Sequence, residues 1–291
     1  MKNLLTALLL IVASTSYAQD FATSFKSTEI VPGIYMVEGV SGFGGGNMSL
    51  LVGEDYIVMI DDGILPLAPT LLAHVTATAG RPINFIINTH VHGDHVGGNA
   101  HFAENGTVVF AHDNIRKRLV ADSSSAGGDG GLPVVTFGEG VTFHLNGLEA
   151  QVFHIPRAHT DGDAAIYFPG VNVIHAADVL FNNLFPYIDL DNGGTVDGFI
   201  AGQKKLISLA DDETRIIPGH GPLATKADLQ RNLLVLTDSQ ARVKLLVDQG
   251  WTIDKILEAN PLSVYHEDYN WSVITTELMT RTLYRSLTTE D

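Results

Sequence analysis

The sequence predicts an α+β layered fold built from two similar halves. In each half, short segments rich in β-forming residues are followed by a helical segment. Of the 291 residues, 45% are hydrophobic and 17% are charged, an ordinary balance for a globular chain with a sizeable core. No Pro-rich or Ser-rich linker divides residues 19–291, so we expect a single domain there.

The first half contains predicted strands that are short, partly alternating and rich in β-formers: residues 34–40, 49–52, 56–60 and 83–88. The glycine-rich segment 41–47 joins the first two strands as a hairpin loop with unusual backbone freedom. Helices are predicted over residues 69–79, 99–104 and 113–121. Residues 122–131 are rich in Ser and Gly, which favours a mobile loop.

In the second half, the same patterns predict strands over residues 134–137, 141–145, 149–154, 164–167, 171–176 and 215–217. Predicted helices cover residues 196–209, 226–249, 252–259 and 272–286. Trp251 and Trp271 are expected to pack these last helices. His74, His101, His112 and His266 are expected on the surface or in helices, whereas His144, His154 and His175 fall in strands.

The first 18 residues have the three parts of a signal peptide. Lys2 supplies a positive start, residues 4–12 are apolar but too short to span a bilayer, and small residues precede a cleavage point after Ala18. A short core helix is the alternative interpretation. We therefore expect a periplasmic or secreted protein, and no later stretch is apolar enough to cross a membrane.

Charge and cysteine content exclude several functions. The net charge of -16 opposes binding to nucleic acid and to anionic membrane surfaces, so a small-molecule substrate is the expected partner. The absence of cysteine excludes a cysteine nucleophile, a thiolate metal ligand and lipid attachment at an N-terminal cysteine. The sequence gives no indication of the oligomeric state.

The strongest motif lies directly after the buried strand 83–88. His90 and His92 alternate, so both can point to one position where that strand ends. The turn at Gly93 lets Asp94 and His95 fold back toward a second position nearby. Imidazole and carboxylate groups are suitable zinc ligands, and four such groups at the end of a core strand are otherwise hard to justify.

Three further candidates follow in order, each near the end of a predicted strand. His159 lies between two strands, Asp178 follows strand 171–176, and His220 follows strand 215–217. Each is weak evidence alone, since a single histidine is more often structural. Their value comes from their order after the first motif.

This order resembles the metallo-β-lactamase superfamily, over about residues 34–221. The resemblance implies a four-layer αββα sandwich with two Zn²⁺ ions at one edge. Carried over by position, the first zinc would be bound by His90, His92 and His159 and the second by Asp94, His95 and His220, with Asp178 bridging the two. The loop 41–47, which includes Phe43, matches the position of a substrate-covering flap.

The resemblance also implies a hydrolytic mechanism. Two close dications lower the pKa of a shared water, and the resulting hydroxide would attack a carbonyl carbon. Asp94 is the predicted catalytic residue, because it would orient the hydroxide and relay its proton to the leaving group. The expected enzyme is an exported binuclear zinc hydrolase acting on an ester, lactone, thioester or amide bond.

Departures from the family pattern bear on the substrate. Class B1 lactamases have a cysteine where this chain has Asp178 and a lysine where it has Phe181, while a bridging Asp is typical of glyoxalase II and lactonases. Segment 181–189 would supply an apolar, aromatic wall, with Phe181, Asn183 and Phe185 as substrate contacts beside Phe43.

Several alternatives stay open. A β-lactamase, including one of weak and promiscuous activity, competes with the hydrolase of an ester, lactone or thioester. A zinc-binding protein without turnover and a phosphodiesterase need similar ligands. Asp61 is expected either to hydrogen-bond the metal loop or to cap a turn. Arg157 is expected either to meet an anionic substrate or to form a surface salt bridge.

Overall fold

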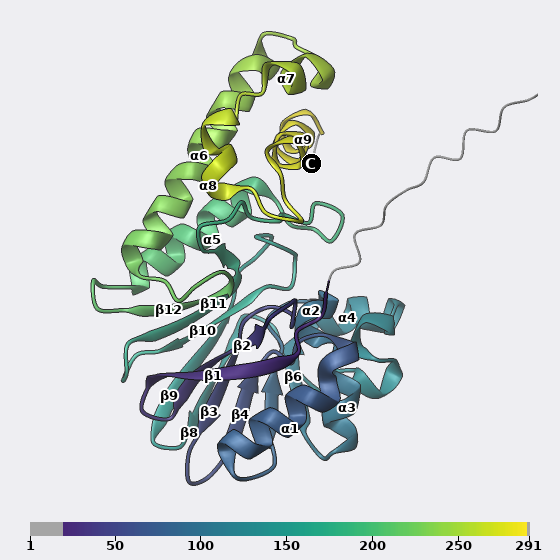
Figure 1. Ribbon diagram of the computed structural model, residues 1–291, viewed down its shortest axis with the longest axis vertical. Coiled ribbons are helices and arrows are strands. Elements are labelled where there is room, and N and C mark those ends of the chain that lie inside the picture. The colour runs from purple at the N-terminus through teal and green to yellow at the C-terminus, as the bar shows by residue number, and fades with distance from the viewer. Residues whose placement is uncertain (1–19, 290–291) are drawn as a thin grey trace, which may run out of the picture.

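Two β-sheets pack face to face, and helices cover the outer face of each (Figure 1). The structure is a computed structural model that describes residues 20–289, so the predicted signal peptide 1–18 lies outside the described residues. The first sheet has the order β1-β2-β3-β4-β5-β6-β7 and the second the order β12-β11-β10-β9-β8. This arrangement confirms the predicted α+β fold with four αββα layers.

The first sheet changes from antiparallel to parallel pairing at β4. Its strands are β1 (Ser24–Val31), β2 (Ile34–Val40), β3 (Met48–Val52), β4 (Ile57–Ile60), β5 (Phe85–Ile87), β6 (Val108–His112) and β7 (Val135–Phe137). The helices of this half are α1 (Ala68–Ala79), α2 (Gly93–Val96), α3 (Asn99–Glu104) and α4 (Asp113–Ala121), with short 3-10 helices η1 (Leu65–Leu67), η2 (Ser124–Ala126) and η3 (Asp129–Gly131).

The second sheet is antiparallel except for the parallel pair β11 and β12. Its strands are β8 (Gly140–Leu145), β9 (Leu148–His154), β10 (Ala164–Phe168), β11 (Val173–Phe181) and β12 (Arg215–His220). The helices of this half are α5 (Val196–Leu209), α6 (Lys226–Asp248), α7 (Ile253–Ala259), α8 (His266–Tyr269) and α9 (Thr276–Thr288), with the 3-10 helix η4 (Ser263–Tyr265).

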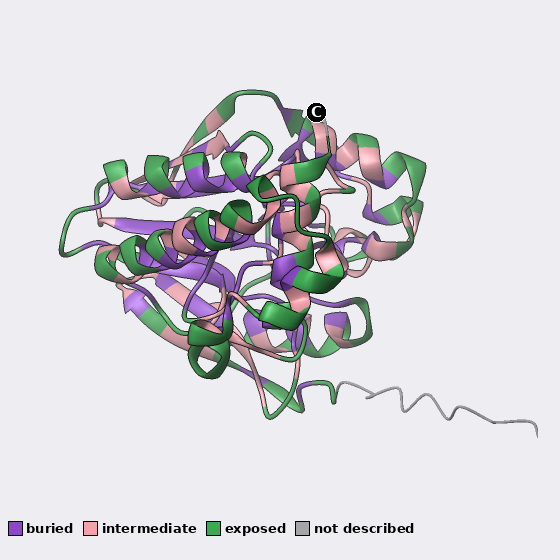
Figure 2. Cartoon of the chain, turned by 90° about the horizontal axis from the view of Figure 1, so that it is seen from above, coloured by how far each residue is buried: buried purple, intermediate pink, exposed green. Residues whose placement is uncertain are grey.

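The first sheet is buried on both faces, as its continuously apolar strand β4 shows. In β4, Val58 and Ile60 pack between the two sheets, whereas Ile57 and Met59 pack toward α1 and α3. Successive side chains of a strand point to opposite faces, so a continuous apolar strand requires a partner layer on each side. Figure 2 shows this buried interior beneath helices whose outer faces are exposed.

Helix ends carry the expected local signals. Thr225 and Asp228 form a capping box at the start of α6, and Thr195 caps α5 through the backbone N–H of Gly198. Gly80 ends α1 with a left-handed φ of 70°. These signals are why the bounds of α1, α5 and α6 agree closely with the predicted ranges.

Some local predictions were wrong. Residues 122–131 were expected to be a mobile loop, but they form η2 and η3, and Ala126 is fully buried. His112 was expected on the surface or in a helix, but it is the buried last residue of β6 and its ring stacks on that of His154, with centroids 3.9 Å apart. Strands β1 and β6 were missed.

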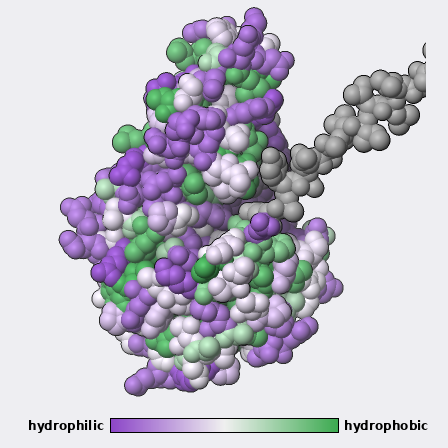
Figure 3. All heavy atoms as spheres, viewed as in Figure 1, coloured by the Kyte–Doolittle hydropathy of each residue, from purple (hydrophilic) through white to green (hydrophobic). Residues whose placement is uncertain are grey.

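The outer surface mixes residue types. Hydrophilic and hydrophobic residues are interspersed over the face seen in Figure 3. Within residues 20–289, no helix combines the length and the apolar character needed to cross a membrane.

Candidate metal centre

The histidine-rich motif begins three residues after β5, where the first sheet faces the second. His90 and His92 precede the short helix α2, and Asp94 and His95 lie within it. The second half contributes His159 from the loop between β9 and β10, Asp178 from β11 and His220 from β12. The seven predicted ligands therefore come from both halves of the fold and meet between them.

One group of donors contains His90, His92, His159 and Asp178. His159 Nε2 lies 2.8 Å from His92 Nδ1 and 3.3 Å from Asp178 Oδ2. His90 Nε2 lies 3.7 Å from the same carboxylate oxygen. All four side chains can place a donor atom around one point, so the group could hold a metal ion.

A second group lies beside the first. His220 Nε2 lies 3.3 Å from Asp94 Oδ2 and 3.5 Å from Asp178 Oδ2. His95 Nε2 lies 3.5 Å from Asp94 Oδ2 and 3.1 Å from Asp178 Oδ1. The donor atoms of His95, Asp178 and His220 form one candidate set, and those of His90, Asp94 and His95 form another.

Asp178 belongs to both the His159 group and the His220 group, and the backbone explains how it reaches them. It lies inside β11, not after a strand as predicted, because β11 continues to Phe181. Ala177 has a left-handed φ of 46°, and the pairing of β11 with β12 shifts register on both sides of it. This irregularity re-aims the next side chain toward the donors.

Gly219 gives that carboxylate its space. A Cβ at Gly219 would lie 1.9 Å from Asp178 Oδ1 and 2.7 Å from the carbonyl carbon of Ala177. Any larger residue would collide with backbone as well as with the carboxylate. The sequence Pro218-Gly219-His220 therefore needs glycine in the middle for steric reasons.

Several donor atoms in this cluster have no hydrogen-bond partner and are therefore available to bind a metal ion. His90 Nε2, His95 Nε2 and Asp178 Oδ1 are buried and have no hydrogen-bond partner. The 3.1 Å approach of His95 Nε2 to Asp178 Oδ1 is an ion-pair contact that does not meet hydrogen-bond geometry. A buried polar atom left unpaired is costly, and imidazole and carboxylate are hard-to-borderline ligands of the kind zinc accepts. The residues present therefore fit a metal.

Two of the histidines are held neutral, which is the form that binds metal. Burial lowers the pKa of His159 to about 4, against the opposing effect of Asp178. Burial also holds the pKa of His90 well below its usual value, aided by the neighbouring His95. These two donors would bind a cation without first losing a proton.

The second group is charged in the absence of a cation. Burial alone would lower the pKa of His220, but Asp178 and Asp94 raise it to about 9. Burial alone would raise the pKa of Asp178, but the surrounding histidines, His95 first, hold it well below its usual value. A cation bound here would replace protons on the imidazoles, so its binding would release protons.

Asp61 hydrogen-bonds the metal loop, which is one of its two predicted roles. Its Oδ2 lies 2.8 Å from His95 Nδ1, and its Oδ1 accepts the backbone N–H of Thr89 at 2.8 Å. The hydroxyl of Thr89 donates to Oδ2 and lies 3.1 Å from His90 Nδ1. These bonds direct the Nε2 atoms of His90 and His95 toward the cluster.

Asp189 has a similar role that the sequence did not indicate. Its Oδ2 lies 2.8 Å from His92 Nε2, which leaves Nδ1 of that ring facing His159. The carboxylate also accepts from the backbone and side chain of Asn192. His159 is oriented differently, by a 2.7 Å hydrogen bond from Nδ1 to the carbonyl of Tyr187. Both supports come from one segment, 187–189.

We expect an Asp189→Asn variant to bind metal about tenfold to a hundredfold more weakly than the unchanged protein, because the orientation of His92 depends on that carboxylate. The measurement is competition for Zn²⁺ against a chromogenic chelator. Asp191→Asn is the matched control, since Asp191 lies in the same loop but is exposed and pairs with Arg285. Equal affinities in the two variants would show that Asp189 does not support the metal.

A cavity of about 380 Å³ opens onto the cluster. His92, Asp94, Asp178 and His220 reach it from the donor groups, and the remaining lining residues are Phe43, Ile64, Phe181, Tyr187, Trp271 and Val273. Of the four predicted substrate contacts, Phe43 and Phe181 line this cavity. The rings of both lie nearly parallel to that of His220, with centroids 6.4 Å and 5.1 Å away.

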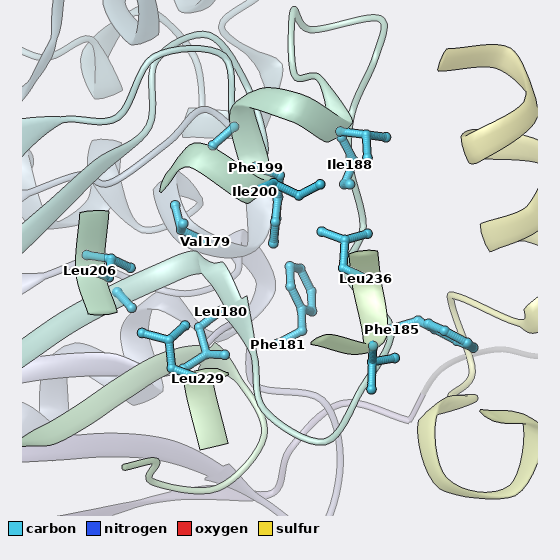
Figure 4. Close-up of a cluster of buried hydrophobic side chains, with 14 of the residues drawn as sticks. Val179, Leu180, Phe181, Phe185, Ile188, Phe199, Ile200, Leu206, Leu229 and Leu236 are labelled. Carbon is cyan, nitrogen blue, oxygen red and sulfur yellow. The ribbon is translucent and has the colours of Figure 1, made fainter. Parts of the chain in front are cut away.

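Asn183 and Phe185 do not line the cavity, so the structure does not place them as substrate contacts. Asn183 is exposed and has a left-handed φ of 60°. Phe185 is fully buried in the core between the second sheet and its helices, where its ring contacts Tyr265 and Tyr269. Figure 4 shows Phe181 among the apolar side chains of this core, with Phe185 farther along the same segment. Both rings belong to this core, but only that of Phe181 also borders the cavity.

Trp271 was expected only to pack the C-terminal helices, and that prediction was incomplete. It lines the cavity, and its indole N–H donates to the carbonyl of Phe185 at 2.9 Å. Its position 51 residues after His220 gave no local signal for this role. The glycine-rich loop is also more anchored than expected, because Asn47 donates from its backbone to Gly219 and from its side chain to Pro218 and Gly221.

Two curated relatives each match about half of this chain. A hydroxyacylglutathione hydrolase of Nitrosococcus oceani is 32% identical over 144 residues, covering 48% of this chain and 49% of the relative. The alpha subunit of a 2,4-dinitroanisole O-demethylase from Nocardioides sp. is 30% identical over 142 residues, covering 48% of this chain and 41% of the relative. The chain thus spans about half the length of these curated relatives.

Solved structures agree in fold. A metallo-beta-lactamase from Pontibacter korlensis superposes with a TM-score of 0.63 at 19% identity, over 74% of this chain and 100% of the other. At that identity the likeness concerns the fold alone. The model of the family described as the metallo-beta-lactamase superfamily matches residues 41–220. That match covers more than half of the chain and all seven clustered donors, so the chain belongs to the metallo-beta-lactamase superfamily.

Proposed function

We propose that the protein is a hydrolase that holds two Zn²⁺ ions and cleaves an ester, lactone, thioester or amide bond of a small molecule. The observation that carries this proposal is Asp178, whose carboxylate lies within 3.1–3.7 Å of donor atoms in both groups. A shared carboxylate between two sets of imidazoles suits a pair of close cations. The cavity beside it gives a substrate access to both.

The reaction follows from the residues at the floor of the cavity. Bound zinc would lower the pKa of a shared water and so supply a nucleophile near neutral pH. Asp94 reaches the cavity with a quarter-exposed side chain, 3.3 Å from His220 Nε2. Its pKa is held well below the usual value, since burial, which would raise it, is outweighed by His95 and His220. Asp94 is thus ionised, and its place at the cavity would let the carboxylate orient the nucleophile and relay a proton to the leaving group.

The relatives support hydrolysis of an acyl bond. The name hydroxyacylglutathione hydrolase, carried by several of them, states the cleavage of a thioester. The name 2,4-dinitroanisole O-demethylase instead states the cleavage of an aryl ether. This chain spans only about half the length of these relatives. Our proposal for the bond that it cleaves therefore rests mainly on the cluster of donors.

The test uses residues 19–291 loaded with Zn²⁺ and a panel of p-nitrophenyl acetate, a γ-lactone, an acyl thioester and the β-lactam nitrocefin. We expect turnover of at least one of the first three, lost on treatment with a chelator and restored by Zn²⁺. Hydrolysis of nitrocefin alone would instead favour a β-lactamase. If no compound is hydrolysed faster by the loaded protein than by the chelated protein, the proposal of a hydrolase fails.

We also propose that the protein is exported, on the basis of residues 1–18 alone. Expression of the full chain in a bacterial host should place the mature protein outside the cytoplasm, with Gln19 at its N-terminus. Mass spectrometry of the intact protein checks this result. A chain that retains Met1 or Lys2 and stays in the cytoplasm would contradict export.

A further inference from the structure

The wall of the metal cavity is completed by a segment that the family match does not include. Trp271 and Val273 line the cavity, yet both lie beyond residues 41–220. Opposite contributions come from Phe43 in the glycine-rich loop, Ile64 after β4 and Tyr187 after β11. The wall away from the donors is therefore aromatic and aliphatic, and part of it lies outside the family match.

Trp271 is held firmly in that wall. Its Nε1 donates to the carbonyl of Phe185 at 2.9 Å, and its ring centroid lies 5.9 Å from that of Phe181 and 5.7 Å from that of His220. Its backbone N–H donates to the carbonyl of Ile274, which closes the turn that carries Val273. A ring fixed by its own hydrogen bond offers a preformed surface for a ligand.

No Lys or Arg side chain of residues 20–289 lines this cavity, and its only basic side chains there are the donors His92 and His220. Three arginines of these residues make their contacts away from this cavity. Arg118 binds Asp161 and Asn192, and Arg285 binds Asp191. Arg157 lines a different cavity, together with Arg285. At the wall away from the donors, a carboxylate on the substrate would thus meet apolar rings without a Lys or Arg side chain to bind it, which disfavours an anionic group there.

We infer that the cavity selects an uncharged substrate whose aryl or branched apolar group packs against Trp271. This inference rests on the proposed hydrolytic function and adds to it the substrate class and a residue that determines specificity. Apolar area removed from water by the wall would contribute to binding of such a group. Trp271 touches the substrate in this arrangement but takes no part in the chemistry.

The test compares two esters that differ by one carboxylate, p-nitrophenyl hydrocinnamate and its para-carboxy derivative, with p-nitrophenyl acetate as a small reference. With the zinc-loaded protein we expect kcat/KM for hydrocinnamate to exceed that for the carboxy derivative at least about tenfold. In Trp271→Ala, the ratio of kcat/KM for hydrocinnamate over acetate should fall about tenfold, mainly through KM. Trp251→Ala, at an exposed tryptophan remote from the cavity, should keep the original ratio.

A binding measurement separates this inference from the proposed function. Titration calorimetry of benzylacetone and its para-carboxy derivative into the zinc-loaded protein needs no turnover. Tighter binding of the neutral ketone, weakened in Trp271→Ala but not in Trp251→Ala, supports the inference even if no ester is cleaved. If esters are cleaved but the carboxylate and Trp271→Ala change neither kcat/KM ratio nor ketone binding, the inference is overturned and the hydrolase proposal stands.

Discussion

An Asp178→Asn variant is expected to retain fewer than two Zn²⁺ ions per chain. Its kcat/KM should fall about a thousandfold or more, because removing a metal ligand costs more activity than removing a residue that only orients a ligand. The amide keeps the shape of the side chain but removes the negative charge shared by the two donor groups. His95 and His220 would then also lose the partner that raises the pKa of both imidazoles. Metal content by mass spectrometry and kcat/KM on the responding ester check this result.

The control for Asp178→Asn is the same change at Asp248, an exposed residue that pairs with Lys244 on α6. That variant should keep both the metal content and the activity of the unchanged protein. If Asp178→Asn binds two Zn²⁺ ions as tightly as the control does, Asp178 does not bridge two cations. The assignment of one shared carboxylate would then have to be abandoned.

Removal of metal should lower the melting temperature by about 8–16 °C. Free Zn²⁺ at about a thousand times Kd stabilises the folded protein by about 4 kcal/mol. Each kcal/mol shifts Tm by about 2–4 °C in a chain of this size. Without a cation, buried donors such as His90 Nε2 and His95 Nε2 stay unpartnered. Calorimetric scans with Zn²⁺ and with excess chelator measure the shift.

The rise in melting temperature caused by Zn²⁺ should increase with pH. The pKa of His220 is about 9 without metal, so Zn²⁺ must displace its proton at any lower pH. Metal affinity, and with it the stabilisation, should therefore be larger at pH 8 than at pH 6. Superimposable scans with and without Zn²⁺ at both pH values would rule out metal binding as a source of stability.

The fold and the first four donors could be predicted because their signals are local, whereas His159, Asp178 and His220 were predicted only from their order after the first motif. Strand alternation, the glycine that ends α1 and the spacing of His90, His92, Asp94 and His95 all lie within single segments of sequence. Strand β6 was missed although it is paired on both sides, by β5 and β7. Its residues resemble many short apolar runs, and only the neighbouring strands identify it.

The parts that could not be predicted depend on contacts between distant segments. Asp189 supports His92 across 97 positions of sequence, and Trp271 reaches the cavity only because the segment after α8 folds back over Phe185. The prediction that Phe185 contacts the substrate was wrong for the same reason, since distant segments decide where that ring packs. Residues 181–189 read as one apolar wall, but of these only Phe181 and Tyr187 line the cavity, whereas Phe185 packs in the core.

The donors come from both halves of the fold, so a pair of cations bound by them would connect the two halves. His90, His92, Asp94 and His95 belong to the first half, whereas His159, Asp178 and His220 belong to the second. The halves could not hinge apart without stretching coordination bonds. Binding of metal would thereby make the whole molecule more rigid. The zinc-loaded protein should resist proteases better than the metal-free protein.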